Sequence, residues 1–312
     1  MAEATLGQKL AYYTLYGFMK LLGLLPEWLL YYPVTDLLYF IMYHVIHYRV
    51  AITRSNLLHA FPDKSDAERK IIEKRYYRHL AEICIDTIDL TGIGCKRLRR
   101  RMVIENEDAH RRATEDIDWI ADMSHYGAWE YFIAYSAGEK LGRDTIGVYR
   151  PLHNRVMNMI YCSIRSRMNM TPVPMTVFLR HVINNRRNGV KMTIGLIADQ
   201  APPWFHRDYW FDFLNQPTAF FDGPESIAMK FGMPVYFTHI EKTSRAHYKV
   251  RFEMIYDGHE AVAPHEITRR YVSRLEKMIC ERPELWLWSH RRWKHKPTSE
   301  ELDAQHSMEC QE

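Results

Sequence analysis

The sequence predicts an α/β fold in which helices cover both faces of a mixed central sheet, preceded by N-terminal membrane-associated helices. From residue 117 onward, short β-rich runs alternate with helical stretches, which is the order of elements in α/β proteins. The last two β-rich runs, PVYFTHIE and HYKVRFEMIYD, are separated only by a short turn, so we expect an antiparallel pair and a mixed sheet. Before this region, residues 10–48 concentrate Leu and Tyr around few charges.

The N-terminal segment contains no long uninterrupted apolar run. Lys20, Glu27 and Asp36 interrupt it, so no run reaches the roughly 18 residues of a clear membrane-spanning helix. We therefore expect helices that lie in the membrane interface, with aromatic rings at headgroup level. Two other interpretations stay open, which are a pair of buried core helices joined at Pro26 and a single tilted span over residues 28–48. No small-residue cleavage site follows, so we expect the segment to stay attached.

We expect the chain to be organised in four segments. These are a membrane-associated helical region (1–48), a helical linking segment (49–116), the α/β domain (117–297) and a polar tail (298–312). In the linking segment, Ser65 and Glu68 form a capping box that predicts the start of a long amphipathic helix. In the α/β domain, we expect strands over 116–123, 144–150, 191–199, 234–241 and 247–257, and helices near 127–140, 153–168, 176–188, 223–232 and 266–282.

Composition excludes several classes of protein. The 42 Lys and Arg residues against 38 Asp and Glu make the surface only mildly basic, which favours acidic partners and argues against a dedicated nucleic-acid binder. The five cysteines form no C-x-x-C pair, so neither a disulfide framework nor a zinc site is indicated, and a reducing compartment is the simplest inference. The 16 histidines are scattered, and no G-x-S-x-G serine elbow or P-loop is present.

The stretch MSHYGAWEYF, residues 123–132, places His125 and Glu130 on either side of Gly127, directly after an expected strand. On a continuous helix these side chains would lie roughly 140° apart, so they meet only if His125 lies in a turn that Gly127 permits. Glu130 would then hold one imidazole nitrogen while the other faces a substrate. Because the motif lacks a Ser or Cys nucleophile, the base would activate a substrate hydroxyl. The alternative is a helix-capping histidine beside a structural glutamate.

The motif H-x-x-x-x-E, together with VYRPLHN, GLIADQ and RPELWLWSHRRWK, resembles the late acyltransferases of lipid A biosynthesis, within the lysophospholipid acyltransferase superfamily. The stretch RSNLLHAFPDKSDAER is similar to the family segment that links the membrane-associated N-terminus to the catalytic domain. The resemblance runs over nearly the whole chain, and its blocks occur in the family order. This sequence departs from the family at Tyr126, where many members carry Asn, and in the aromatic insert PPWFHRDYWFDFLNQP.

The resemblance implies transfer of a fatty acyl chain from an acyl carrier protein thioester to a hydroxyl of a lipid A precursor. It places the reaction at the cytoplasmic face of a Gram-negative inner membrane and requires no cofactor and no metal. His125 would take the proton of the attacking hydroxyl, and Glu130 would orient and stabilise the imidazole. Backbone donors near Gly127 would stabilise the tetrahedral oxyanion.

Further candidate residues follow two other expected strands. Arg150 ends one strand, and Asp199 with Gln200 ends another, and the strand ends of an α/β sheet commonly converge on one crevice. By their match to the family these residues are expected to bind substrate, with Arg150 contacting a phosphate or the pantetheine of the donor. The alternative is a structural ion pair between Arg150 and Asp199.

Basic and aromatic clusters allow more than one interpretation. The runs KRLRRR, NNRRNGVK and SHRRWKH would meet anionic phosphosugars, membrane phosphates or the acidic carrier protein, or form a solvated face. The aromatic residues of the insert would form an acyl-chain wall, a membrane-contacting flap or ordinary core; they are Trp204, Phe205, Tyr209, Trp210 and Phe213.

Two alternative functions remain at this stage. An enzyme of the same fold would acylate another lipid acceptor, such as an aminolipid or a glycosylated phospholipid. A membrane-bound lipid-binding protein with an inactive site is the second, and the presence of His125, Glu130, Arg150 and Asp199 weighs against it.

Overall fold

The computed structural model describes residues 4–137, 142–202 and 209–309. Within these ranges the centre of the molecule is a seven-stranded sheet with the strand order β1-β9-β8-β2-β5-β3-β4. Its strands are β1 (Met102–Ile104), β2 (Trp119–Met123), β3 (Arg143–Tyr149), β4 (Met170–Pro174), β5 (Lys191–Ile197), β8 (Val235–Ser244) and β9 (His247–Tyr256). Strands β8 and β9 are antiparallel, and every other neighbouring pair is parallel. The predicted mixed sheet is therefore confirmed.

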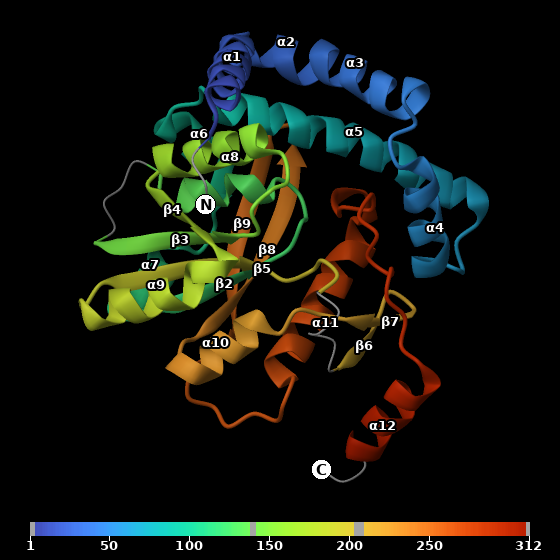
Figure 1. The fold of residues 1–312 in the computed structure, drawn as a ribbon. Coiled ribbons are helices and arrows are strands. Elements are labelled where there is room, and N and C mark those ends of the chain that lie inside the picture. Colours follow the sequence, from blue (N-terminus) through green and yellow to red (C-terminus); the bar gives the residue numbers. More distant parts are fainter. Residues whose placement is uncertain (1–3, 138–141, 203–208, 310–312) are drawn as a thin grey trace.

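Helices lie on both sides of this sheet. Figure 1 shows α5 (Asp66–Leu90), α6 (Cys95–Arg101) and α8 (Arg155–Arg167) above the sheet, and α10 (Gly223–Phe231) and α11 (Glu266–Glu281) below it. The other helices of this region are α7 (Glu107–Thr114) and α9 (Met175–Arg187). Helix α11 shows why the sequence adopts this arrangement, because its buried residues recur at helical spacing and form one apolar stripe; they include Ile267, Tyr271, Leu275 and Met278.

The capping box predicted before the long helix α5 is confirmed. The Ser65 hydroxyl accepts a hydrogen bond from the Glu68 backbone N–H at 3.3 Å, and Glu68 Oε2 accepts one from the Ser65 backbone N–H at 2.8 Å. These two bonds satisfy donors that a helix start otherwise leaves unpaired. Helix α5 lies between the sheet domain and the N-terminal helices (Figure 1).

The N-terminal helices form a layer across α5. They are α1 (Leu6–Leu22), α2 (Glu27–Leu29), the π-helical segment η1 (Leu30–Val34), α3 (Thr35–Phe40) and the π-helical segment η2 (Ile41–Val45), followed by α4 (Val50–Ala60). The first two helices are separated before Pro26, the N-cap of α2, which is the junction named in the alternative of two core helices. The outer face of this layer is apolar and open, with exposed fractions of 84% at Leu6, 72% at Leu24 and 65% at Trp28.

These helices are not simply core helices, since so many of their large apolar side chains are exposed. In the described part of the chain, no single helix has both the length and the apolar character needed to cross a membrane. Only the bent pair Glu27–Val45 and Val50–Ala60, which meet at 88°, passes that test together. The association with a membrane remains a prediction.

A buried polar network ties the N-terminal layer to the sheet domain. The hydroxyls of Tyr31 and Tyr131 both donate to Oδ1 of Asp86, at 2.7 and 2.9 Å. Arg101 donates to the Tyr31 hydroxyl at 2.9 Å and forms an ion pair with Asp89. Burial raises the pKa of Asp86 to about 7, against the lowering effect of the two tyrosine hydroxyls. This Tyr31 network joins α5, α6 and η1 to the segment that follows the candidate site.

Several elements were missed by sequence reasoning. Strand β4, with sequence MTPVP, contains two prolines and lies at the sheet edge, where a missing backbone N–H is tolerated. The others are the short strand β1, the hairpin strands β6 (Trp210–Phe213) and β7 (Gln216–Ala219), and helix α12 (Ser299–Glu309) in the expected polar tail. Strand β1 falls in the expected linking segment 49–116 yet pairs with β9, so that segment contributes to the sheet.

The helix expected near 127–140 is wrong in type and extent. A 3-10 helix, η3 (Trp129–Tyr135), follows the turn after β2, and residues 138–141 lie outside the described ranges. Of the seven residues of η3, Tyr131 to Tyr135 are buried. A 3-10 helix has about three residues per turn, so it directs successive side chains differently from the α-helix that the sequence pattern suggested.

Candidate active site

His125 lies in the turn that leaves the central strand β2. All five residues of β2 are buried, which fixes the strand and the start of the turn. Gly127 has a positive φ of 58°, and a Cβ atom there would lie only 2.9 Å from Cγ2 of Ile240. A glycine is therefore required for the turn that places His125 at the carboxyl end of the central strand β2. The side chain of His125 is 19% exposed, so part of it reaches the molecular surface.

Asp199 meets His125 because the two strands that carry them are paired. Strands β2 and β5 run parallel with Met123 opposite Ile197, so the residues that follow both strands emerge side by side. Oδ1 of Asp199 accepts a hydrogen bond from Nδ1 of His125 at 2.7 Å. Oδ2 accepts from the backbone N–H of His125 at 2.9 Å and from the indole N–H of Trp286 at 2.8 Å. The carboxylate is thus held by three donors.

These contacts keep Asp199 ionised although it is buried. Burial by itself would raise the pKa of Asp199, but the charge and hydrogen bonds of His125, with the Trp286 indole, lower it below its ordinary value. An ionised carboxylate only accepts, so Nδ1 of the neutral imidazole carries its hydrogen and Nε2 offers a lone pair. The side-chain nitrogen of Gln200 lies 3.1 Å from this Nε2 atom. His125, Asp199 and Gln200 are therefore brought together.

Glu130 does not form the predicted contact with the imidazole. Its carboxylate is bound by the guanidinium of Arg165, with Nη2 to Oε1 at 2.7 Å and Nε to Oε2 at 3.2 Å. The physical reason is that η3 turns Glu130 towards α8, while Asp199 already occupies Nδ1 of His125. Burial by itself would lower the pKa of Arg165. The attraction of the Glu130 carboxylate outweighs this effect, so the pKa of Arg165 is raised. The guanidinium also lies 5.8 Å from the centre of the Tyr149 ring, at the end of β3.

Arg150 follows β3 at the same edge of the sheet, because β3 is parallel to β5 and β5 to β2. Its side chain is exposed. Among the described residues it makes no ion pair with Asp199, so the structural pairing considered above is not formed. Its expected role in binding substrate stays a prediction.

The backbone N–H of Gly127 itself is already bonded, so the expected oxyanion donors near Gly127 do not include it. It donates to the carbonyl oxygen of Leu285 at 2.9 Å. Tyr126, at the position where many family members carry Asn, is fully buried, and its hydroxyl donates to the carbonyl oxygens of Met278 and Arg282. Both residues therefore attach the turn to the C-terminal segment rather than to a substrate.

Two buried groups surround the His125–Asp199 pair. Asp122 on β2 is 2% exposed, and burial together with repulsion from Asp199 raises its pKa well above the ordinary value, which favours its neutral form. Arg292 is 3% exposed, and burial lowers its pKa to about 10, which leaves it charged at neutral pH. One neutral acid and one cation thus flank the ionised Asp199, which favours its charge.

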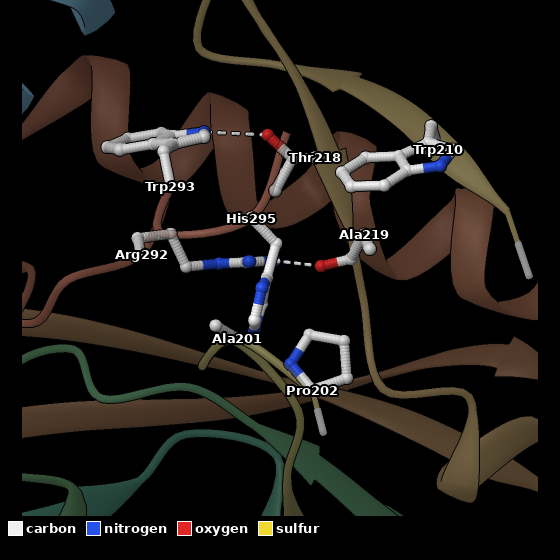
Figure 2. A pocket seen from close by; sticks show the side chains of 8 residues that line it. All are labelled: Ala201, Pro202, Trp210, Thr218, Ala219, Arg292, Trp293 and His295. Carbon is white, nitrogen blue, oxygen red and sulfur yellow. Dashed lines mark hydrogen bonds between the residues drawn. The ribbon is translucent and has the colours of Figure 1, made fainter. Parts of the chain in front are cut away.

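Arg292 lines a small crevice that begins one residue after Gln200. The crevice is lined by Ala201, Pro202, Trp210, Thr218, Ala219, Arg292, Trp293 and His295. Figure 2 shows Arg292 extending toward the carbonyl oxygen of Ala219, to which it donates at 2.6 Å. The indole of Trp293 donates to the Thr218 hydroxyl at 2.7 Å. These bonds attach the C-terminal segment to the hairpin β6–β7 beside the site.

The basic runs divide into buried and exposed residues. Arg101 and Arg292 are buried and have structural contacts, whereas Lys96, Arg100 and Arg291 are exposed. Of the aromatic insert, Trp204 and Phe205 lie outside the described residues. Trp210 and Phe213 are core residues with exposed fractions of 5% and 0%, and Tyr209 stacks on His265 at 4.5 Å between ring centres. For Trp210 and Phe213 the core interpretation is therefore correct.

Sequence reasoning missed Arg165 and Trp286 as partners of the site. A signal for Arg165 was present, since a glutamate next to buried aromatic residues requires a cation or several donors. For Trp286 the only signal was its place in the block RPELWLWSHRRWK, which gives no indication of a contact with Asp199. Within the described ranges, no group of three His, Cys, Asp or Glu side chains is arranged to hold a metal ion.

The arrangement supports general-base chemistry at Nε2 of His125. Asp199 fixes the tautomer and compensates the charge of the imidazolium that forms when the base takes a proton. The ring edge is also held by Trp129, at 5.1 Å between ring centres. No nucleophilic side chain is bonded to Nε2 among the described residues, so the proton would come from a substrate.

Comparison with known proteins identifies the family of this chain. The family described as bacterial lipid A biosynthesis acyltransferase matches residues 4–295. The chain is 24% identical over 269 residues to the lipid A biosynthesis palmitoleoyltransferase of Escherichia coli (strain K12), with 81% of each chain covered. It is equally similar to a lipid A biosynthesis acyltransferase of Shigella flexneri, 24% identical with 81% of each chain covered. Since the family match spans nearly all of the 312 residues, this chain belongs to the bacterial lipid A biosynthesis acyltransferases.

Proposed function

We propose that this protein transfers a fatty acyl group from an acyl carrier protein thioester to a hydroxyl of a lipid A precursor, with His125 as the general base. The observation that carries the proposal is the bond from Nδ1 of His125 to Asp199 at 2.7 Å, which leaves Nε2 as the lone-pair acceptor of the ring. Family membership supports the acceptor, a lipid A precursor. Acyl transfer to a hydroxyl needs such a base, because a neutral alcohol is a weak nucleophile.

The reaction follows from these positions. Nε2 of His125 removes the proton of the acceptor hydroxyl as its oxygen attacks the thioester carbonyl carbon. Asp199 stabilises the imidazolium, and the tetrahedral oxyanion then collapses with cleavage of the C–S bond. The imidazolium returns its proton to the departing thiolate, so that the ester and the free carrier thiol are the products. Asp199 takes the orienting role that the sequence assigned to Glu130.

Glu130 acts through Arg165 in this proposal. The two hydrogen bonds between them hold the guanidinium at the end of β3, beside Tyr149 and in the strand-end region that contains His125. A fixed guanidinium in this position would attract a substrate phosphate or the developing oxyanion. Arg150, exposed at the same edge, would bind the phosphate or pantetheine of the donor.

The N-terminal layer would hold the enzyme at the cytoplasmic face of the inner membrane. The exposed side chains of α1, α2, α3 and the connection between α1 and α2 support this proposal; they include Leu6, Leu10, Leu24, Trp28 and Leu37. A surface of this kind is typical of helices that lie in the bilayer interface. The layer and the active site are parts of one structure through the Tyr31 network, so membrane contact and catalysis would occur in a fixed relation.

The test is an acyl-transfer assay with purified full-length protein, the palmitoleoyl thioester of acyl carrier protein and a lipid A precursor. Mass spectrometry of the lipid product should show one added acyl group. His125→Ala should lower the rate by roughly 10²- to 10⁴-fold, the range for loss of a general base. His259→Ala is the matched control, since His259 is exposed in the turn after β9. A folded His125→Ala protein with normal turnover, or transfer only to other lipids, would contradict the proposal.

A further inference from the structure

The Gln200 side chain lies against Nε2 of His125, the atom that the acceptor hydroxyl must reach. Nδ1 of His125 is bonded to Asp199, so Nε2 has the only lone pair of the ring, and the Gln200 amide nitrogen lies 3.1 Å from it. An amide N–H pointing at this lone pair makes the same hydrogen bond that the O–H of an acceptor would make. The resting enzyme therefore has its base already occupied.

The two partners of this bond differ in how firmly they are held. His125 is fixed by two bonds to Asp199 and by its edge contact with Trp129 at 5.1 Å, and Asp199 is itself fixed by Trp286. The Gln200 side chain has no other hydrogen bond to the described residues. When an acceptor enters, it is thus Gln200 that moves away, while the imidazole keeps its place.

We propose that the Gln200 amide keeps water away from Nε2 of His125. A lipid acceptor displaces the Gln200 side chain, whereas a single water molecule does not. This inference rests on the proposed function. If a water molecule displaced Gln200, its hydrogen bond to Nε2 would only replace the hydrogen bond from the Gln200 amide. It makes no further contact that would favour the exchange. A lipid acceptor contacts the enzyme through its other groups as well, and that binding energy can drive the amide aside. Gln200 thereby favours transfer over hydrolysis of the thioester.

The reaction that competes with acyl transfer is hydrolysis of the thioester. In hydrolysis, the water oxygen bonds to the thioester carbonyl carbon, its proton passes to Nε2 of His125, and the C–S bond breaks. The thiolate then takes the proton from the imidazolium, which gives a free fatty acid and the carrier thiol. The same base serves both reactions, so the ratio of fatty acid to acylated lipid reports access to Nε2.

Three substitutions separate the hydrogen bond from simple filling of space. Gln200→Ala removes both, Gln200→Met keeps a side chain of similar length without an N–H, and Gln200→Glu offers an acceptor in place of the donor. We expect the ratio of hydrolysis to transfer to rise about fivefold to tenfold in the Ala and Met variants, the effect of losing one hydrogen bond. In Gln200→Glu, the new carboxylate favours the protonated imidazole, so the midpoint of the pH–rate profile should move to higher pH.

The experiment uses full-length protein with the palmitoleoyl thioester of acyl carrier protein, with and without the lipid A precursor, and thermal melts of each variant. If transfer and hydrolysis fall together in all three variants and the pH midpoint stays in place, Gln200 is merely structural and the inference is wrong. A wild-type ratio in Gln200→Met would show that bulk alone excludes water, which also overturns it. Wild-type protein that makes neither product would instead overturn the proposed function.

Discussion

Asp199 accepts two hydrogen bonds from the same residue, one from Nδ1 of His125 at 2.7 Å and one from its backbone N–H at 2.9 Å. The imidazole is thereby fixed both in position and in tautomer, because rotation of the ring would break the first bond while the second holds the backbone in place. The indole of Trp286 donates to the same carboxylate at 2.8 Å and restricts it further. A base that must accept a proton at a defined point needs this degree of fixation.

Asp199→Asn should therefore stop catalysis while the fold persists. In the wild type, Oδ2 of Asp199 accepts from the backbone N–H of His125 and the indole N–H of Trp286. The amide oxygen of the Asn variant is expected to take this place, so that its NH₂ group faces Nδ1 of His125. Nδ1 must then become an acceptor, which moves the ring hydrogen to Nε2 and disables the base. We expect turnover to fall at least about 10²-fold. Single-turnover transfer assays measure this.

The control for that change is Asp122→Asn. Asp122 is equally buried, and its neutral form is favoured because burial and the neighbouring Asp199 raise its pKa. Exchange of a neutral acid for an amide should leave most of the activity. If the two variants lose activity equally, the loss reflects general disturbance of the buried region and the assignment of Asp199 fails.

Glu130 and Arg165 should behave as one unit. Glu130→Gln keeps one acceptor but removes the charge that holds the guanidinium, and Arg165→Gln removes the guanidinium itself. We expect each to reduce turnover by about tenfold or more, with the double variant no worse than Arg165→Gln alone. Arg187→Gln, exposed at the end of α9, is the control. Independent, multiplying losses would indicate that Glu130 acts directly on His125 or substrate.

Docking of the acidic carrier should depend on exposed basic residues. Reversal of charge at Lys96, Arg100 or Arg291 should slow transfer from the acyl carrier protein and reduce its sensitivity to salt, because exposed charges are screened over about 10 Å at 0.1 M ionic strength. The exposed Lys277 on α11 provides a matched reversal elsewhere on the surface. Arg101 and Arg292 are unsuitable for this test because they are buried. Equal rates with the carrier thioester and the coenzyme A thioester at every salt concentration would exclude such docking.

The exposed apolar layer should determine binding to lipid vesicles. Combined substitution of Leu6, Leu10 and Leu24 by Glu should release the protein from anionic phospholipid vesicles in a sedimentation assay, with little effect on melting, since these residues are 84%, 67% and 72% exposed. Met229→Glu with Met254→Glu, at residues 51% and 53% exposed, controls for added charge on other surfaces. Equal sedimentation of both sets would place the membrane contact elsewhere.

His110 should make the protein sensitive to acid. It is 3% exposed and lies among aromatic rings, and burial together with Arg143 and Arg111 lowers its pKa from 6.5 to about 4. The unfolded chain therefore takes up this proton first, so the stability that the neutral ring contributes is present above pH 6.5 and is lost as the pH falls towards 4.

This loss amounts to about 3 kcal/mol of unfolding free energy. His110→Phe keeps a flat ring in the same cage and should lose less stability between pH 7 and 4.5 than the wild type. Denaturant unfolding at both pH values measures the difference, and His259→Phe in an exposed turn serves as control. A parallel decline of wild type and His110→Phe would exclude His110 as the sensitive group.

The sequence predicted the alternating elements well because most of them have strong periodic patterns. The capping box of Ser65 and Glu68 and the helix near 266–282 depend on local patterns, and both appear as expected. Strand β4 was missed because its two prolines argue against a strand, a rule that does not apply at a sheet edge. The helix after Gly127 was wrong because local propensity does not distinguish an α-helix from the 3-10 helix that tertiary packing produces here.

The site was predicted in part for a related reason. The strand-end argument correctly placed His125 and Asp199 together at the carboxyl ends of their strands, since parallel pairing of β2 with β5 brings these ends side by side. The partner of the imidazole was wrong because sequence proximity favoured Glu130, whereas the contact comes from a residue 74 positions away. Arg165 and Trp286 reach the site from α8 and from the C-terminal segment, and no spacing rule connects such distant positions.

The pairing of β1 with β9 has a consequence for how the protein is made. Met102 lies opposite Tyr248, so the edge of the sheet closes only after the ribosome has released almost the whole sheet domain. The apolar N-terminal layer emerges first and remains without its sheet partner throughout that interval. Nascent chains arrested before residue 247 should accordingly be open to proteases between α6 and β2, and chains extended past residue 256 should become resistant in a single step.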